Sequence, residues 1–516
     1  MTARAHLTSD LIVIGAGPAG ARAAIAAARC GLATTLIDDA YAAGGQIYRA
    51  PPQAWRLEEG ANAGQDFAAG AALRAELEVS GVTHLHGHSV WSVTPGFEVR
   101  TIAVDGEYCM LAPRLIVATG VTERVIPFPG WTTPGVSGLA AATHLLKSQQ
   151  ILPGARTLVA GSGPLLYAVA AAIISGGGKV VAIADLCRRA DWLAALPALV
   201  GAPALLGRGL AWHARLALER VPVYYRHHVY QVEGGVTVTN AELGVVAADG
   251  TPMRAAPTVR VSVDAVVVGH GLVPSTDITR LLRASHGFDA GRGGWVVQCD
   301  PHGRTSLAGL YAAGDCTGVA GAQAAALAGT IAGLAAAADA GRLEAADFHA
   351  QAAPLLRAYA RADRVGARMS RLMAPRSGLL DAMTADTIVC RCEDVTRGAL
   401  DTAIAAGAGD CNELKAWTRC GMGPCQGRTC GEAVAELVAR HLGGRKRAGH
   451  WTARVPLRPL PIEQLAPDCP YEEIWNSPPG KIATAILPSE NTRHMRTDVP
   501  PAATSRASGV RRSAEA

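Results

Sequence analysis

The sequence has few aromatic residues and little net charge. Phe, Trp and Tyr make up only 5 % of the 516 residues, although 49 % of the chain is apolar, so its cores must be built mainly from Ala, Val and Leu. The formal net charge is +5, and much of it lies in a basic C-terminal tail, which predicts no nucleic-acid partner. With 58 glycines as well, the composition is typical of α/β proteins with closely packed helices.

The sequence also has little that would place it in a membrane. The first ten residues have no apolar signal core, and the Ala-rich runs near 160–175 and 319–340 are interrupted by Gly, Ser, Gln and Thr. We therefore expect no transmembrane segment and a cytoplasmic location, with any association with the inner membrane made through partners. In such a reducing compartment, the twelve cysteines are expected to be metal ligands or redox groups rather than disulfides.

A glycine-rich turn follows the first apolar strand. The string L-I-V-I-G-A-G-P-A-G contains a G-x-G-x-x-G pattern at the start of an Ala-rich helix. There, backbone N–H groups can approach a pyrophosphate, and the helix dipole favours its charge. Asp38 and Asp39 end the next strand, about twenty residues further on, where a carboxylate would accept a hydrogen bond from a ribose hydroxyl. The pattern predicts a dinucleotide site whose turn is formed by Gly15, Gly17, Pro18, Ala19 and Gly20.

Further motifs in the same order resemble the two-dinucleotide-binding-domain flavoproteins, over roughly residues 9–340. The resemblance implies FAD in the first site, with Asp315 bonding the ribityl chain and the next helix directed at the isoalloxazine ring. The alternative for this site is a non-redox dinucleotide. The additional residues that the resemblance assigns to the site are Gly44, Gly45, Gln46, Ala118, Thr119, Gly120, Gly314, Asp315 and Gln323.

A second strand–glycine–helix unit begins near Arg156. Its turn reads Gly161-Ser162-Gly163-Pro164, but Leu166 replaces the third glycine, and Asp185 ends the following strand. This turn either binds NAD(P) or keeps the fold without the ligand, and the second interpretation is favoured. No cysteine pair lies beside the flavin motifs, so thiol–disulfide reduction is not expected.

The order of these patterns predicts one dinucleotide-binding domain interrupted by another. The expected segments are an N-terminal tail (1–9), the FAD-binding domain in two parts (10–150 and 271–340), a second dinucleotide-binding-like domain (151–270), a helical connector (341–385), a cysteine-rich module (386–442), a proline-rich segment (443–488) and a disordered tail (489–516).

The cysteine-rich module offers four thiolates from two loops. Cys390-x-Cys392 is followed, after 32 intervening residues, by Cys425-x4-Cys430. Four thiolates suit either a structural zinc ion or an iron–sulfur cluster, but C-x-C is a poor match to zinc knuckles. We expect these four cysteines to be the ligands. Cys420, five residues before Cys425, is the alternative that spacing leaves open.

The module resembles the small [2Fe-2S] domain of bacterioferritin-associated ferredoxin and of the nitrite reductase large subunit. The shared elements are C-x-C-E-x-V-T, a helical stretch, L-K-x-x-T-R and G-M-G-x-C-Q-G-R-x-C. That ferredoxin has C-x-x-C in the second loop, where this chain has C-x4-C. The resemblance implies a [2Fe-2S] cluster, with zinc or an empty site as the alternative. Cys411, in the helical stretch, is expected to be a core thiol.

The whole order of motifs, over residues 9–460, resembles one subunit of the heteromeric amine dehydrogenases. Members of this group occur in opine oxidase (its A-type component), in hydrogen cyanide synthase (its B-type component) and as the α subunits of D-hydroxyproline and proline dehydrogenases. The resemblance implies that a D-amino-acid-oxidase-like β subunit oxidises the C–N bond of a small amino acid, imino acid or opine. It also implies that this chain passes electrons to a quinone or another respiratory acceptor, and it allows a small ferredoxin-like γ subunit.

We therefore expect an α/β oxidoreductase subunit: a two-dinucleotide-binding-domain flavoprotein, with one Rossmann-like domain inserted in another, followed by a small helical [2Fe-2S]-binding module. The sequence shows no nucleophile–base pair and no paired carboxylates, so no catalytic residue is assigned. A flavin accepts two electrons and an iron–sulfur centre accepts one at a time, which suits a relay. The alternatives are a stand-alone NAD(P)H-dependent reductase of a soluble partner and a non-enzymatic scaffold with a zinc module.

Overall fold

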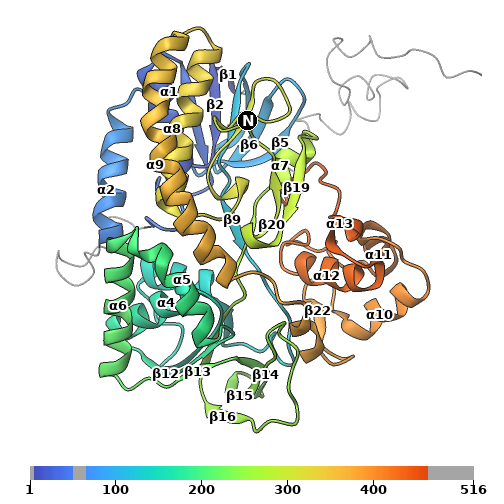
Figure 1. Cartoon of the computed structure of the whole chain (residues 1–516). Coiled ribbons are helices and arrows are strands. Elements are labelled where there is room, and N and C mark those ends of the chain that lie inside the picture. Colours follow the sequence, from blue (N-terminus) through green and yellow to red (C-terminus); the bar gives the residue numbers. More distant parts are fainter. Residues whose placement is uncertain (1–4, 50, 52–64, 463–516) are drawn as a thin grey trace, which may run out of the picture. The chain divides into compact units, whose positions relative to one another are not determined.

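The computed structural model describes residues 5–49, 51 and 65–462 (Figure 1). Within this part, every residue up to Leu460 belongs to one unit. The expected disordered tail (489–516) and most of the proline-rich segment (443–488) lie outside the described residues.

A five-stranded parallel sheet carries the first glycine turn on its central strand. That strand is buried at every residue, which explains its unbroken apolar sequence. The sheet combines two separate stretches of the chain, because its edge strand β21 follows the entire second domain, as the sequence predicts. The strand order is β21 (Leu310–Ala312), β8 (Leu115–Val117), β2 (Leu11–Ile14), β3 (Thr34–Asp38) and β4 (Thr83–His86).

Two glycines let the backbones of neighbouring helices beside this sheet come into contact. A Cβ on Gly329 would lie 1.9 Å from the carbonyl oxygen of Ala19, and one on Gly333 would lie 2.3 Å from that of Ala23. Any side chain at either glycine would force the helices apart. The helices that lie side by side here are α1 (Pro18–Arg29), α8 (Ala322–Asp339) and α9 (Ala345–Leu372) (Figure 1).

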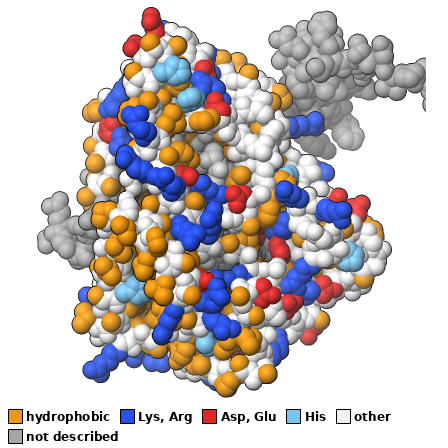
Figure 2. Space-filling view, in the orientation of Figure 1, with side chains coloured by type: hydrophobic (Ala, Val, Ile, Leu, Met, Phe, Trp, Pro, Cys, Tyr) orange, Lys and Arg blue, Asp and Glu red, His pale blue; other side chains and the backbone are white. Residues whose placement is uncertain are grey.

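Helix α8 is the one helix in the described part of the chain with the length and apolar composition of a membrane span, and 56 % of its 18-residue window is buried inside the protein. Helix α8 packs between α1 and α9. Helix α9 is amphipathic and, on the face drawn in Figure 2, Lys and Arg side chains gather over its course.

The second domain repeats the design with another parallel sheet. Its central strand β11 runs into the second glycine turn and helix α4 (Pro164–Ser175), and the π-helical segment Leu145–Gln149 follows the short helix α3 (Leu139–His144). Helices α5 (Arg189–Val200) and α6 (Pro203–Leu218) follow the fourth strand. The strand order is β10 (Val136–Gly138), β17 (Ala265–Gly269), β11 (Arg156–Gly161), β12 (Lys179–Asp185) and β13 (Val223–Tyr225).

Smaller sheets complete both domains. The antiparallel strands β9 and β18 connect the first domain to the second and back again. The remaining elements are β9 (Val121–Glu123), β18 (Leu272–Pro274), the sheet of β1 (Ala5–Thr8), β7 (Gly106–Leu111), β6 (Glu98–Ala103) and β5 (Ser89–Val93), the sheet of β14 (His227–Gly234), β15 (Val238–Val245) and β16 (Val259–Ser262), the hairpin of β19 (His286–Asp289) and β20 (Gly294–Val297), and helices α2 (Gln65–Glu78) and α7 (Asp277–Leu281).

The cysteine-rich module has its own helical core. Helix α11 begins at a clear N-cap, because the Asp410 carboxylate accepts hydrogen bonds from the N–H groups of Asn412 and Glu413. Cys411, the first residue of that helix, is buried in this core, as the sequence predicts for a core thiol. The elements are β22 (Ile388–Cys390), β23 (Val395–Thr396), α10 (Arg397–Ala405), α11 (Cys411–Thr418), α12 (Gly431–Leu442) and α13 (Arg445–Ala448).

Candidate functional site

The first glycine turn forms a tight junction between β2 and α1. Gly15 has a φ of 101°, and a Cβ there would lie 2.4 Å from the carbonyl oxygen of Ala118. A Cβ on Gly20 would lie 1.7 Å from the carbonyl oxygen of Gly15. Gly17 is the N-cap and Pro18 the first residue of α1, and no side chain caps the helix. The N–H groups of its first turn are therefore left for a ligand, as a pyrophosphate site requires.

Two further motifs border this turn. A Cβ on Gly45 would lie 2.9 Å from the Cα of Gly17, and one on Gly314 would lie 2.7 Å from the Cβ of Ala19. Ala118, which directly follows β8, is the residue that contacts Gly15 from the neighbouring strand. The structure thus brings four separate stretches of sequence together around one turn, where a flat, extended nucleotide could lie against backbone rather than side chains.

The two acids after β3 have different environments. The carboxylate of Asp38 accepts hydrogen bonds from the backbone N–H groups of Ala16 and Ala40, the second at 2.7 Å. Burial raises the pKa of Asp38, although both hydrogen bonds act in the opposite direction. Asp39 is exposed, and its ion pair with Arg458 is long, at 3.9 Å. Asp38 therefore holds the turn in place, whereas Asp39 is accessible from solvent.

Asp315 begins the short 3-10 segment Asp315–Thr317, seven residues before the first residue of α8. One of its carboxylate oxygens accepts from the N–H groups of Ala320 at 2.9 Å and Gly321 at 3.0 Å, and burial raises its pKa. Gln323, the second residue of α8, and Gln46 have exposed side chains at the border of this region. Two backbone N–H groups thus hold one carboxylate oxygen of Asp315, and its second oxygen is left to accept a hydrogen bond from a ligand hydroxyl.

Glu123 is a residue that sequence reasoning missed. It ends β9, and its carboxylate lies 3.2 Å from the backbone nitrogen of Ala140 at the start of α3. A Cβ on Gly138 would lie 1.9 Å from one of its oxygens, so the glycine makes room for the acid. Burial raises the pKa of Glu123 to about 7. No pattern in the sequence marks it, since its surroundings come from three separate elements.

The second glycine turn is covered by the protein itself. A Cβ on Gly163 would lie 2.4 Å from the Cγ of Met373, a residue that follows α9. Asp185 is fully buried, and its carboxylate accepts hydrogen bonds at 2.8 Å from the Tyr167 hydroxyl, the Trp192 indole N–H and the backbone N–H of Cys187. The glycine turn and the carboxylate of Asp185, which would bind a dinucleotide, are therefore both occupied by contacts with other residues of the chain.

Five cysteines of the C-terminal module come together. The Sγ atoms of Cys390, Cys420 and Cys430 all lie within 4.8 Å of one another, and that of Cys420 is 3.9 Å from that of Cys430. The thiols of Cys392 and Cys425 form a hydrogen-bonded pair of their own. The first three thiols are buried, and the second two are partly exposed. The structure thus brings together all four predicted ligands and the alternative, Cys420.

The thiols differ in how readily they ionise. Burial raises the pKa of Cys390, while the hydrogen bond with Cys420, followed by burial, raises that of Cys430 far more. Burial acts to raise the pKa of Cys425, but hydrogen bonds from Thr429, Cys392 and Gly427 together lower it. Buried thiols of this kind ionise when a metal ion supplies the compensating charge. The donor set therefore fits a thiolate-bound metal centre.

Trp451 covers the second cysteine loop and is also unmarked in the sequence. A Cβ on Gly427 would lie 1.6 Å from its ring, and one on Gly421 would lie 2.4 Å away. Both glycines also have a positive φ, of 80° and 84°. The Trp451 indole N–H donates to the carbonyl oxygen of Cys411 at 2.8 Å, which fixes the ring over the loop. The G-M-G and Q-G-R parts of the motif thus serve close packing.

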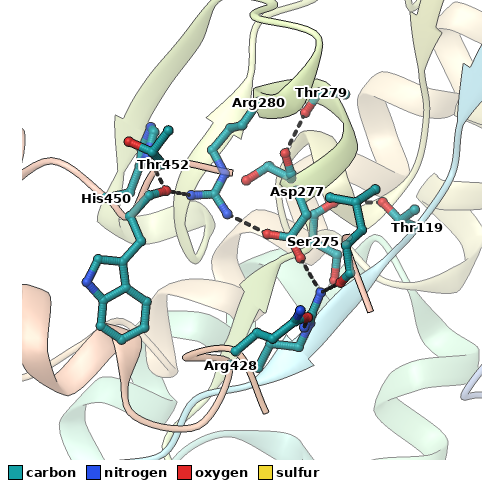
Figure 3. A network of polar contacts seen from close by, with 12 residues as sticks. Thr119, Ser275, Asp277, Thr279, Arg280, Arg428, His450 and Thr452 are labelled. Atoms are coloured by element: carbon teal, nitrogen blue, oxygen red, sulfur yellow. Dashed lines mark hydrogen bonds and ion pairs between the residues drawn. The ribbon is translucent and has the colours of Figure 1, made fainter. Parts of the chain in front are cut away.

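A polar network joins the cysteine loop to the first dinucleotide domain (Figure 3). Arg428, between Cys425 and Cys430, lies 2.9 Å from the carboxylate of Asp277, which also binds Arg280 at 2.5 Å. Arg280 in turn donates to the carbonyl oxygen of Trp451 at 3.0 Å. Close by, the Thr119 hydroxyl of the A-T-G motif donates to the carbonyl oxygen of Ser275 at 2.7 Å. The G-L-V-P-S-T-D segment therefore contacts both predicted cofactor sites.

A second, more deeply buried link supports the same junction. Glu432, in the first turn of α12, pairs with Arg124 at 3.3 Å and with Arg445 at 3.0 Å. Although burial opposes ionisation, the two guanidinium groups hold the pKa of Glu432 below its usual range. Arg124 also donates to the carbonyl oxygen of Gly293 at 2.7 Å. This ion-pair group ties the N-terminus of α12 to the segment after β9.

Fold and site together define a flavoprotein-type oxidoreductase with an attached thiolate module. Residues 9–341 match the pyridine nucleotide-disulphide oxidoreductase family, and residues 388–440 match the BFD-like [2Fe-2S] binding domain. The chain is 33 % identical over 486 residues to the A-type component of opine oxidase from Rhizobium meliloti (strain 1021), covering 89 % of this chain and 98 % of that protein. It is 32 % identical over 466 residues to the hydrogen cyanide synthase protein HcnB of Pseudomonas aeruginosa, and the match covers 87 % of this chain and 97 % of that protein.

The chain therefore belongs to the family of HcnB and the A-type opine oxidase component, within the pyridine nucleotide-disulphide oxidoreductases. Among solved structures, it is similar to L-proline dehydrogenase from P. horikoshii, with a TM-score of 0.66 and 20 % identity over 90 % of this chain and 81 % of that one, which supports the fold. The two domain families imply FAD and a [2Fe-2S] cluster, and the glycine turn and the five-thiol group fit these cofactors. The predicted family, fold and cofactors are thus confirmed.

Proposed function

We propose that this chain is the electron-transfer subunit of a heteromeric dehydrogenase that oxidises the C–N bond of a small amino acid, imino acid or opine. In this proposal, a D-amino-acid-oxidase-like β subunit carries out the oxidation, and this chain passes the electrons to a quinone or another respiratory acceptor, in the cytoplasm or at the inner membrane through partners. The relatives support the assignment, because they are themselves named as subunits of an oxidase and of a synthase.

The observation that carries the proposal is the contact between the two predicted cofactor sites. Arg428 lies in the cysteine loop and donates to the carboxylate of Asp277. Asp277 comes two residues after Ser275, whose carbonyl oxygen accepts a hydrogen bond from Thr119 of the flavin motif. FAD supplies two-electron redox chemistry when bound, and the cluster supplies one-electron chemistry. The residues of this chain would hold the two groups on domains that Arg428 and Asp277 join, and Trp451 covers the cysteine loop.

The same argument gives a proposal for the residues. For FAD, Gly15, Gly17 and Gly20 would surround the pyrophosphate, and Asp315 would accept from the ribityl chain. For the cluster, we propose Cys390, Cys392, Cys425 and Cys430. Cys420 remains the alternative to Cys425 or Cys430, and its sulfur lies within 4.8 Å of those of Cys390 and Cys430. Cys430 is favoured because it stands with Cys425 in the single string G-M-G-P-C-Q-G-R-T-C, which resembles the pattern of the family.

The stand-alone NAD(P)H reductase is the second candidate, and one experiment separates the two. The purified chain with its FAD bound is mixed with NADH or NADPH under anaerobic conditions, and flavin absorbance is followed. We expect no rapid bleaching, because Met373 covers the second glycine turn and Asp185 is used internally. Bleaching within seconds would support the reductase instead. Co-expression with a β-type subunit should then give amine-dependent reduction of an artificial acceptor.

Metal analysis tests the zinc scaffold. A [2Fe-2S] centre requires about two iron and two sulfide per chain. One zinc per chain with no sulfide would contradict the proposal.

A further inference from the structure

A concave site at the edge of the second domain is lined by four arginines. Its volume is about 270 Å³, and its charged lining consists of Arg188, Arg368, Arg371, Arg376 and one acid, Asp191. Asp191 is already engaged, since its carboxylate binds the Arg188 guanidinium at 2.8 Å and the Arg188 backbone N–H at 2.9 Å. Three positive charges are thus left in excess in one small depression, which favours the presence of an anion there.

The guanidinium groups have donors to spare. The buried Nη1 of Arg376 has no hydrogen-bond partner among the described residues, and its Nη2 has only the Cys187 sulfur at 3.6 Å. The Arg371 guanidinium forms no hydrogen bond or ion pair with the described part of the chain. The Arg368 guanidinium uses one nitrogen to donate to the carbonyl oxygen of Ala194 at 3.0 Å. Planar guanidinium groups with free donors match phosphate oxygens in charge and geometry.

The position of this depression is that of a ligand site, but a dinucleotide does not fit it. Arg188 follows β12 and caps helix α5, so the depression lies outside the carboxyl end of a parallel strand, where α/β sheets bind ligands. Met373, between two of the arginines in sequence, covers the neighbouring glycine turn. The dinucleotide cradle is therefore closed while the arginines beside it remain open.

Three of the four arginines come from outside the oxidoreductase domain. Arg368 and Arg371 lie on α9 and Arg376 follows it, beyond the matched residues 9–341. Other exposed arginines, Arg357, Arg361 and Arg364, extend along the same helix and would attract an anion toward the depression.

We propose that this depression is a binding site for a compact phosphate-bearing anion, recognised through its phosphate groups by Arg368, Arg371 and Arg376. The phosphate groups could be those of free pyrophosphate or those of a nucleoside polyphosphate. This site is separate from both predicted cofactor sites, so the test of anion binding is independent of the test of the proposed electron-transfer function.

Isothermal titration calorimetry on the full chain with FAD bound tests the proposal, with pyrophosphate, ATP and NADPH as probes at constant ionic strength. We expect pyrophosphate to bind, and Arg371→Gln and Arg376→Gln each to weaken it about tenfold or more, since each removes hydrogen bonds to a charged group. The matched control Arg357→Gln removes an exposed arginine of the same helix outside the depression and should leave the affinity unchanged. Flavin and cluster absorbance should be the same in all variants, which separates loss of the site from loss of the fold.

The probes also distinguish the source of the phosphate. Equal affinity for pyrophosphate and ATP indicates that the phosphates alone are recognised, and tighter binding of ATP identifies a nucleotide; both support the site. Absence of pyrophosphate binding to the wild-type chain would overturn the proposal, as would equal loss in the Arg357 and Arg371 variants. NADPH binding that is tighter than both and reduces the flavin would show that the site belongs to a dinucleotide.

Discussion

The Nη2 atom of Arg428 lies 2.9 Å from a carboxylate oxygen of Asp277, so the cysteine loop is held directly by the flavoprotein domain. Arg428 also donates to the carbonyl oxygen of Leu457 at 2.8 Å. Because one side chain bonds two segments from different parts of the sequence, its loss affects the junction as a whole.

Arg428→Gln should destabilise this junction. We expect a loss of about 1–2 kcal/mol in the free energy of unfolding, because a partly buried carboxylate and a carbonyl oxygen lose their donor. The control is Arg419→Gln, whose ion pair with Glu393 is equally short, at 2.9 Å, but whose side chain is 69 % exposed. Surface pairs contribute less than about 1 kcal/mol. Thermal unfolding of both variants checks this, and equal losses would contradict it.

Serine substitutions should separate the cluster ligands from their neighbours. Cys425→Ser and Cys430→Ser should lose the visible absorbance of the cluster, since each would remove a thiolate ligand. Cys420→Ser should keep it, although its sulfur lies 3.9 Å from that of Cys430. Cys411→Ser serves as the control for a buried thiol outside the group. If Cys420→Ser loses the visible absorbance of the cluster and Cys430→Ser keeps it, then Cys420 is a ligand and Cys430 is not.

Gly427→Ala should disturb the loop far more than an ordinary glycine substitution. A Cβ would lie 1.6 Å from the Trp451 ring, and overpacking of this kind costs about 1–3 kcal/mol. Gly443→Ala is a matched control, because Gly443 also has a positive φ, of 78°, but has open space around it. Differential scanning calorimetry gives both values. Adding Trp451→Ala should recover part of the loss in Gly427→Ala, and a failure to do so would mean that the ring is not the cause.

The buried Glu123 should make stability depend on pH. Its pKa is raised from 4.5 to about 7 in the folded chain, so the folded state binds the proton more tightly than the unfolded state. The contribution of this group is therefore most favourable below pH 4.5 and falls as the pH rises to about 7, by about 3 kcal/mol in total. Glu123→Gln removes this dependence. Denaturant unfolding at pH 5 and pH 8 should show the wild type losing about 2 kcal/mol of unfolding free energy relative to the variant between the two pH values. An unfolding free-energy difference between wild type and variant that does not change with pH would contradict the assignment.

Much of the architecture could be predicted from local patterns. The turn from Gly15 to Gly20, Asp38 and the Gly314-Asp315 pair stand in the order that the fold requires, because each marks a strand end or a helix start. The cysteine spacing likewise predicted a thiolate centre. Glu123, Trp451 and Met373 could not be predicted, since their importance comes from contacts with residues far away in the sequence.

The sequence by itself determined the two glycine turns, the apolar strands around them and the set of cysteines, because backbone geometry and ligand chemistry depend on residue type and local spacing. Only the tertiary structure decided that Cys420 joins the other thiols, that Met373 and the internal bonds of Asp185 close the second turn, and that Arg428 binds Asp277. Each of these depends on which distant segments pack together, and that packing is set by the fold as a whole.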